Sequence, residues 1–105
     1  MLESLRNQKG NYSYQVIIAD RCQSEISERI KQQYPEVHLL PYGEDVAIPM
    51  LRTYALEYAQ GEYIGVIEDH NIPAPDWFLN VAETFLTTST NTVAIGGCIE
   101  NGADE

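Results

Sequence analysis

The stretch Gly61–Trp77, GEYIGVIEDHNIPAPDW, decides the fold that the sequence predicts. Its Tyr63–Ile67 run has the β-branched and aromatic content of a buried strand. The run stops at Glu68-Asp69-His70, and the prolines that follow prevent the loop from continuing as helix or sheet. In open α/β sheets, ligands collect at the carboxyl ends of the strands. The stretch therefore predicts a strand that delivers two carboxylates and an imidazole to a ligand-binding edge.

Glu68, Asp69 and His70 fit two interpretations. Carboxylate oxygens and an imidazole nitrogen can together bind a hard or borderline divalent cation. Acidic residues after a strand are also common in solvated loops, where a carboxylate caps the turn through its own backbone. Three consecutive residues form no fixed ligand pattern, so the spacing alone leaves both interpretations open.

The bulk composition indicates one small globular domain or a piece of a larger one. The 105 residues are 44% hydrophobic and 21% charged, which is typical of globular proteins. The formal net charge of −10 argues against a nucleic-acid partner, because binding a phosphate backbone needs cationic side chains. An acidic chain can still bind a phosphate ligand if a metal ion bridges the two.

The cysteines and the apolar runs bear on the compartment. Cys22 and Cys98 form no C-x-x-C pair, which favours free thiols in a reducing compartment over one disulfide. No apolar run approaches the ~20 residues of a membrane-spanning helix, and the N-terminal residues lack the apolar core of a signal peptide. We therefore expect a cytoplasmic localisation and no membrane span in this chain.

The rest of the chain is predicted to alternate strands and helices. Tyr14–Asp20, YQVIIAD, contains the continuous apolar run of a strand that is buried on both faces of a parallel sheet. Further strands are predicted at Val37–Leu40 and Thr92–Ile99. Helices are predicted over residues 1–9, between the N-cap Ser24 and Pro35, from Pro49, and from Asp76. The order β-α-β-α-β-α-β predicts an α/β fold, with a mostly parallel sheet flanked by helices.

Helical spacing predicts which side chains face the core. The predicted buried positions are Ile26 and Ile30, then Leu51, Tyr54, Ala55 and Tyr58, and finally Phe78, Val81, Ala82 and Phe85. Two charged residues lie outside these stripes. Asp20 ends the first strand, and Arg52 lies near the beginning of its helix, facing away from the apolar stripe. From the pattern alone, Arg52 is an exposed arginine.

These segments together resemble the donor-binding half of family-2 glycosyltransferases, which have the GT-A (Rossmann-like) nucleotide-diphospho-sugar fold. The resemblance runs through LESLRNQ, YQVIIADRCQSE, IPMLRTYALEYAQGEYIGVIEDHNIPAPDW and AIGGCIEN. It implies that residues 1–105 form a single partial nucleotide-sugar-binding domain. The family's first strand, which lies between the first and third strands of this chain, has no counterpart here. Nor does the C-terminal half with the catalytic base, so we expect a truncated domain that is inactive alone.

The resemblance also implies roles for individual residues. Asp20 would contact the base or ribose of the nucleotide, and Arg52 the base or the diphosphate. Glu68-Asp69-His70 falls on the family's Asp-x-Asp or x-Asp-Asp motif. His70 would then be a metal ligand, with Asp69 or Glu68 toward the ribose and the metal. The exchange of an oxygen ligand for an imidazole nitrogen favours manganese over magnesium without requiring it.

The implied activity is inverting transfer of a sugar from a nucleotide-diphospho-sugar to an acceptor that the sequence does not identify, with Mn²⁺ or Mg²⁺ as cofactor. No carboxylate from Asp76 onward is assigned as the catalytic base. The alternative is a non-catalytic α/β binding or assembly module that keeps the fold without a complete active site. A metal-dependent phosphotransfer or receiver-like domain is a weaker option, because no lysine follows a strand. An exposed sheet edge would allow a homo-oligomer to form.

Overall fold

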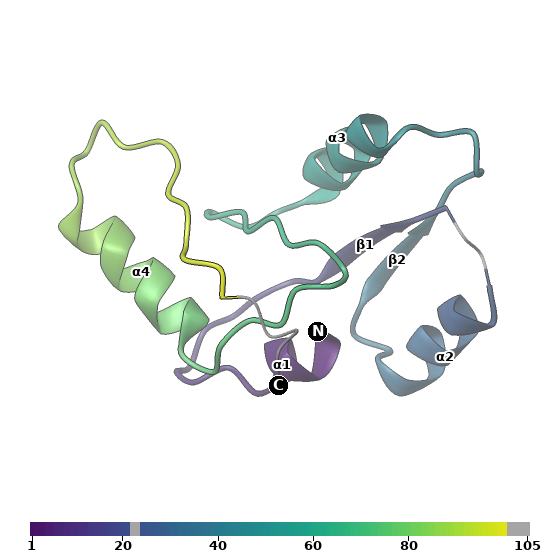
Figure 1. Ribbon diagram of the computed structural model, residues 1–105, viewed down its shortest axis with the longest axis horizontal. Coiled ribbons are helices and arrows are strands. Elements are labelled where there is room, and N and C mark those ends of the chain that lie inside the picture. The colour runs from purple at the N-terminus through teal and green to yellow at the C-terminus, as the bar shows by residue number, and fades with distance from the viewer. Residues whose placement is uncertain (22–23, 101–105) are drawn as a thin grey trace. The chain divides into compact units, whose positions relative to one another are not determined.

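The computed structural model describes residues 1–21 and 24–100 of the chain. The elements are α1 (Leu2–Arg6), β1 (Ile17–Asp20), α2 (Glu25–Gln33), β2 (His38–Pro41), α3 (Ile48–Tyr58) and α4 (Trp77–Thr87) (Figure 1). The chain divides into two compact units. One runs from Tyr12 to Asn71, and the other joins Glu3–Asn11 to the segment that begins at Ile72. The element order confirms the predicted α/β class.

Strands β1 and β2 form a parallel pair, as predicted, with Asp20 opposite Pro41 in the register. Two backbone hydrogen bonds extend the pairing at either end. The N–H of His38 donates to the carbonyl of Val16 at 2.9 Å, and the N–H of Tyr42 donates to the carbonyl of Asp20 at 2.7 Å. The backbone of Asp20 is therefore fixed at the carboxyl end of β1 by the chain that leaves β2.

The helices of this unit cover the pair of strands. α2 connects the two parallel strands, which need a crossover connection of this kind. α3 packs against β1, and Figure 1 shows α2 and α3 on opposite sides of the two strands. All four residues of β1 are half-buried. The strand begins at Ile17 rather than at the predicted Tyr14, which is 45% exposed, and its residues are less buried than the composition predicted.

Ser24 is the N-cap of α2, as predicted, and its side chain takes part in a capping box. The helix ends at Gln33, ahead of Pro35. The prediction that Ile26 is buried is wrong, because its side chain is 63% exposed. The capping box places Ser27 on the buried side instead, at 6% exposure, and neighbouring residues of a helix point about 100° apart. Ile26 therefore points outward.

Helix α3 begins one residue before Pro49, which lies in its first turn. Leu51 is buried at 8% exposure, as predicted, whereas Tyr58 at the far end is 43% exposed. The remaining predicted positions of this stripe are half-buried. The ring of Tyr54 stacks on that of Tyr42, with centroids 5.0 Å apart. The loop after β2 is thereby held against the helix that carries Arg52.

Two predicted strands, Tyr63–Ile67 and Thr92–Ile99, are wrong, because the sheet of the described residues consists of β1 and β2 alone. Tyr63 is 57% exposed and Val66 is 64% exposed. A strand forms only where a neighbouring backbone completes its hydrogen-bond ladder. β-propensity measures the fit to such a surface rather than an intrinsic preference of the backbone. The composition therefore predicted strands that find no partner within the described residues.

In the other unit, Gln8 links the segment after α1 to the beginning of α4. Its side-chain amide donates to the carbonyl of Ala74 at 2.6 Å and accepts from the N–H of Phe78 at 2.8 Å. The side chain of Asp76, the N-cap of α4, makes no capping bond, so Gln8 supplies one.

The helices of this unit differ from their predictions in one respect. α1 ends at Arg6, three residues earlier than predicted, and the chain turns at Gly10, whose φ is 97°. The predicted face of α4 is half-buried.

Few apolar side chains of the described residues are buried in either unit. Among the described residues, the buried hydrophobic side chains are Leu5 in one unit and Leu51 in the other. Many other large apolar side chains, such as Ile72, Leu86 and Val93, are mostly exposed. Because hydrophobic stabilisation scales with the apolar area removed from water, each unit depends on a small number of side chains.

Two further observations bear on the predicted environment. In the part of the chain that the structure describes, no helix has both the length and the apolar character needed to cross a membrane. Cys98 is a free and exposed cysteine. Cys22 lies outside the described residues.

Candidate functional site

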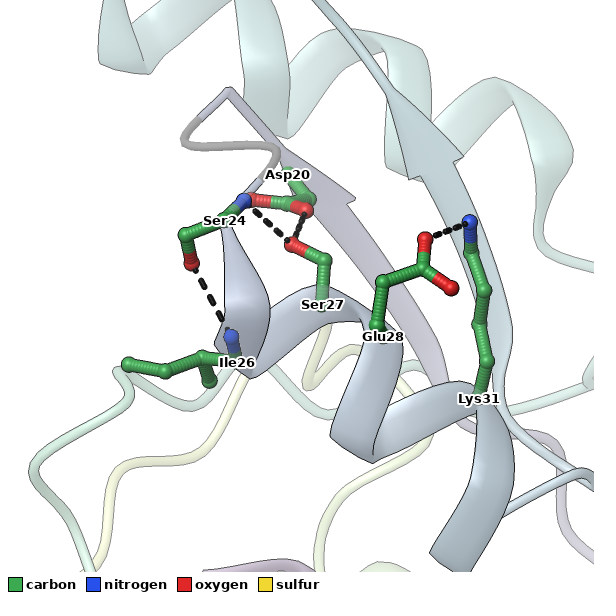
Figure 2. A network of polar contacts seen from close by, with 6 residues as sticks. All are labelled: Asp20, Ser24, Ile26, Ser27, Glu28 and Lys31. Carbon is green, nitrogen blue, oxygen red and sulfur yellow. Dashed lines mark hydrogen bonds and ion pairs between the residues drawn. The ribbon is translucent and has the colours of Figure 1, made fainter.

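Asp20 lies at the carboxyl end of β1, where the strand meets the N-terminus of α2. Its carboxylate oxygen Oδ2 accepts a hydrogen bond from the hydroxyl of Ser27 (Figure 2). That hydroxyl in turn accepts from the N–H of Ser24 at 3.2 Å. The carboxylate of Asp20 is thus attached to the capping box that begins α2.

Asp20 lines a pocket of about 640 Å³, which we call the Asp20 pocket. Its lining residues are Asp20, Ser24, Glu25, Ser27, Glu28, Lys31, Leu39 and Pro41. Lys31 is paired with Glu28, with Nζ and Oε1 2.9 Å apart. The remaining charged groups are acidic, so the pocket suits a ligand group that donates hydrogen bonds. It is unfavourable for a bare phosphate, which carries the same sign of charge.

A second group of candidate residues lies elsewhere in the same compact unit. It consists of Arg52 and the segment Glu68–His70, and we call it the acidic loop site. The guanidinium of Arg52 lies 3.1 Å from Oε1 of Glu68. The other oxygen of Glu68, Oε2, lies 3.2 Å from Nε2 of His70. Glu68 therefore bridges an arginine from α3 and an imidazole from the loop that follows it.

Asp69 contacts the opposite side of the same imidazole. Its Oδ1 lies 3.4 Å from Nδ1 of His70, and its side chain is 98% exposed. The imidazole thus lies between two carboxylates, one at each ring nitrogen. This arrangement places three potential ligand groups on consecutive residues, as the sequence suggested, although a single cation takes only one nitrogen of the ring.

The acidic loop site fits a cation that takes two ligands from the protein. Two ligands that each lie about 2.1 Å from an octahedral cation are about 3 Å apart when they occupy neighbouring positions. The 3.2 Å between Glu68 and His70 is of that size. Mg²⁺ commonly takes its other ligands from water and substrate phosphates. Within residues 1–21 and 24–100, no group of three or more His, Cys, Asp and Glu side chains is arranged to hold a metal ion.

The five residues predicted for the site thus fall into two groups. Arg52, Glu68, Asp69 and His70 are brought together by direct contacts. Asp20 lies in its own pocket, whose lining contains none of those four residues. Both groups belong to the compact unit from Tyr12 to Asn71.

Sequence reasoning missed Ser27, the residue that holds the carboxylate of Asp20. The signal that could have identified it is its position three residues after the N-cap Ser24, which is the second member of a capping box. That position usually carries Glu or Gln, and a serine there attracts less notice.

The model of the family described as Glycosyl transferase family 2 matches residues 1–104. No curated protein and no solved structure matches the chain. The family match confirms the resemblance that the sequence motifs indicated.

Proposed function

Because the chain belongs to glycosyl transferase family 2, we propose that it binds the nucleotide-diphospho-sugar donor of an inverting glycosyl transfer. The observation that carries this proposal is the chain of contacts from Arg52 through Glu68 to His70. These contacts bring the guanidinium of Arg52 close to a carboxylate–imidazole pair. A guanidinium can bind a diphosphate, and a carboxylate with an imidazole can bind its cation. The proposal concerns donor binding, and no residue is assigned as catalytic base.

The nucleoside and the diphosphate of the donor would be bound by different groups. We assign Asp20 to the base or ribose, because a carboxylate accepts hydrogen bonds from the N–H and O–H groups that these moieties present. We assign Arg52 to the diphosphate, because a guanidinium presents several donors that match phosphate oxygens. Arg52 is paired with Glu68, so a diphosphate would compete with that carboxylate for the guanidinium.

The cation in this proposal is Mn²⁺ or Mg²⁺, held by His70 with one carboxylate. Glu68 reaches Nε2 of the ring and Asp69 reaches Nδ1, so the two carboxylates are alternative partners for His70. A bound cation would neutralise charge on the departing nucleoside diphosphate. An imidazole ligand suits manganese somewhat better than magnesium. Glu68 and Asp69 also remain candidates for contact with the ribose.

The test is a thermal unfolding experiment on the 105-residue chain with uridine diphosphate or guanosine diphosphate, each with and without MnCl₂. A ligand that binds only the folded state stabilises it, by about 2.7 kcal/mol when its concentration is 100 times the dissociation constant. We expect one of the two nucleotides to raise the melting temperature, and manganese to increase the rise. Manganese alone and the corresponding nucleoside alone are the controls.

The outcome separates two classes of protein. A melting temperature that millimolar nucleotide and manganese leave unchanged would contradict donor binding. It would favour a non-catalytic α/β binding or assembly module that keeps the fold of the family. A rise with nucleotide that does not depend on manganese would keep the donor site and remove the metal from the proposal.

A further inference from the structure

Ser27 is the one buried polar residue among the described residues, with 6% of its surface exposed. It lies in the first turn of α2 and lines the Asp20 pocket. A buried hydroxyl needs hydrogen-bond partners, because an unsatisfied polar group in the interior destabilises the fold. Ser27 has two such partners, and they belong to different elements of the chain.

The direction of the two hydrogen bonds follows from the chemistry of the partners. The backbone N–H of Ser24 can only donate, so the oxygen of Ser27 accepts from it at 3.2 Å. The single proton of the Ser27 hydroxyl is then donated to Oδ2 of Asp20. Figure 2 shows Ser27 between these two groups. The capping box thus determines where the serine proton points, and that proton determines how one carboxylate oxygen is held.

We propose that Ser27 is a positioning residue for the donor nucleotide, acting by fixing the orientation of the Asp20 carboxylate. The inference rests on the proposed function, in which Asp20 contacts the base or ribose. The backbone of Asp20 is fixed by the bond from Tyr42, and its side chain by the bond from Ser27. Preorganised in this way, the carboxylate loses little conformational freedom when a nucleoside binds.

The assignment makes a specific prediction about which part of the donor Ser27 affects. Asp20 and Ser27 line one pocket, and Arg52 with Glu68–His70 forms the other group of candidate residues. Loss of the Ser27 hydroxyl should therefore weaken binding of a nucleotide and leave binding of inorganic pyrophosphate unchanged. A general loosening of the fold would weaken both.

The experiment measures the affinities of the 105-residue chain for uridine diphosphate, guanosine diphosphate and pyrophosphate, each with Mn²⁺, by calorimetry. The variants are Ser27→Ala, Ser27→Thr and Ser27→Val. We expect Ser27→Ala to weaken binding of the preferred nucleotide about threefold to tenfold, the range expected for one lost hydrogen bond. Ser27→Thr keeps a hydroxyl and should restore most of the affinity. Ser27→Val has the shape of threonine without the hydroxyl and should not.

The control variant is Gln32→Gly, which weakens α2 at an exposed position outside the Asp20 pocket. Glycine is among the poorest helix formers, so this variant destabilises the helix without removing a bond to Asp20. It should bind the nucleotide as the unaltered chain does. If Ser27→Ala does not fold, the comparison of Ser27→Thr with Ser27→Val decides the question.

Asp20→Ala, alone and combined with Ser27→Ala, tests whether Ser27 acts through the carboxylate. The double variant should bind the nucleotide no more weakly than Asp20→Ala alone. A weaker double variant would show that Ser27 contacts the ligand itself, which overturns the inference. Equal affinity of the unaltered chain, Ser27→Ala and Ser27→Val for the nucleotide would also overturn it while leaving donor binding intact. No nucleotide binding by the unaltered chain would overturn both proposals.

Discussion

The Asp20 pocket and the acidic loop site differ in how their side chains are held. Asp20 ends a strand, and its carboxylate is tied to the capping box of α2 through a serine that is 6% exposed. Glu68, Asp69 and His70 lie on a loop, with side chains that are 52%, 98% and 71% exposed. Exposed charged groups interact weakly because water and salt screen them.

The two groups of candidate residues are therefore held in two different ways. In the Asp20 pocket, hydrogen bonds between regular elements hold the Asp20 carboxylate in place. The acidic loop site has the right groups within reach of one another, but little in the surrounding structure holds them in place. We therefore expect substitutions in the Asp20 pocket to change the free energy of unfolding without ligand. Substitutions in the acidic loop site should matter mainly when cation and nucleotide are present.

The largest expected change in the free energy of unfolding comes from a core substitution. It tests whether the Asp20 pocket and the acidic loop site depend on the same buried side chain. Leu51 is 8% exposed and lies on α3, which packs against β1 and also carries Arg52. Leu51→Ala should lower the free energy of unfolding by about 2–5 kcal/mol, as large-to-small substitutions in a core do. Chemical denaturation followed by far-ultraviolet circular dichroism measures it. Nucleotide binding should be lost together with the fold.

Ile26→Ala is the matched control, since Ile26 lies on α2 with 63% of its surface exposed. It should change the free energy of unfolding by less than about 0.5 kcal/mol. Similar effects for the two substitutions would show that the buried position of Leu51 does not support the unit from Tyr12 to Asn71.

The second prediction concerns the acidic loop site with its ligands present. His70→Ala should abolish the manganese-dependent part of the stabilisation by nucleotide, which amounts to at most about 2.7 kcal/mol at 100 times the dissociation constant. The melting temperature without ligand should stay nearly the same, because the His70 side chain is 71% exposed. Differential scanning fluorimetry over a manganese titration measures both quantities.

The carboxylates can be separated in the same experiment. Glu68→Gln and Asp69→Asn each remove one charged partner of the imidazole. The variant that loses the manganese dependence identifies the second ligand. A manganese dependence that survives His70→Ala would exclude the imidazole as a ligand.

The third prediction concerns the Asp20 pocket without any ligand. Ser27→Ala removes half of the capping box and the bond to Asp20, so it should lower the free energy of unfolding by about 1 kcal/mol. Urea denaturation measures this. Asp69→Ala should leave the urea midpoint unchanged, because the Asp69 side chain is 98% exposed. If the two substitutions lowered the free energy of unfolding equally, the Asp20 pocket would be no better organised than the acidic loop site.

The same contrast explains what the sequence could predict. β1, β2 and the beginning of α2 follow from local signals, namely an apolar run, a second short run and the N-cap Ser24. The run Tyr63–Ile67 carries an equally strong local signal and yet forms no strand, because a strand also requires a neighbour in the sheet. The residue composition indicates which run can form a strand, but it does not indicate whether a neighbouring strand is present.

The candidate site shows a similar limit. The proximity of Glu68, Asp69 and His70 follows from their being consecutive, whereas the pairing of Arg52 with Glu68 joins α3 to a loop 16 positions later. Nothing local in the sequence predicts that contact, and from the helical pattern alone Arg52 is an exposed arginine. Its side chain is indeed 53% exposed. The helical pattern therefore predicted the exposure of Arg52 correctly but did not predict its partner Glu68. Which ligand each residue binds stays a prediction.

The smallest expected effect tests the pairing of Arg52 with Glu68. The double-mutant cycle with Arg52→Ala and Glu68→Ala should give a coupling of about 0.2–1 kcal/mol in the unliganded protein, the range for exposed ion pairs. The coupling should fall as salt is raised from 10 mM to 0.5 M, since the screening length shortens from about 30 Å to a few ångströms. Thermal unfolding of the four proteins at both salt concentrations measures it.

A coupling well above 1 kcal/mol that resists salt would show that Arg52 and Glu68 are locked together, and the acidic loop site would then be as organised as the Asp20 pocket. A small, salt-sensitive coupling means that a diphosphate displaces Glu68 from the guanidinium at little cost. Glu68 is then available to the imidazole, which it already contacts through its other oxygen. On the proposed function, such weak pairing would let a diphosphate replace Glu68 at Arg52 while Glu68 keeps its contact with His70.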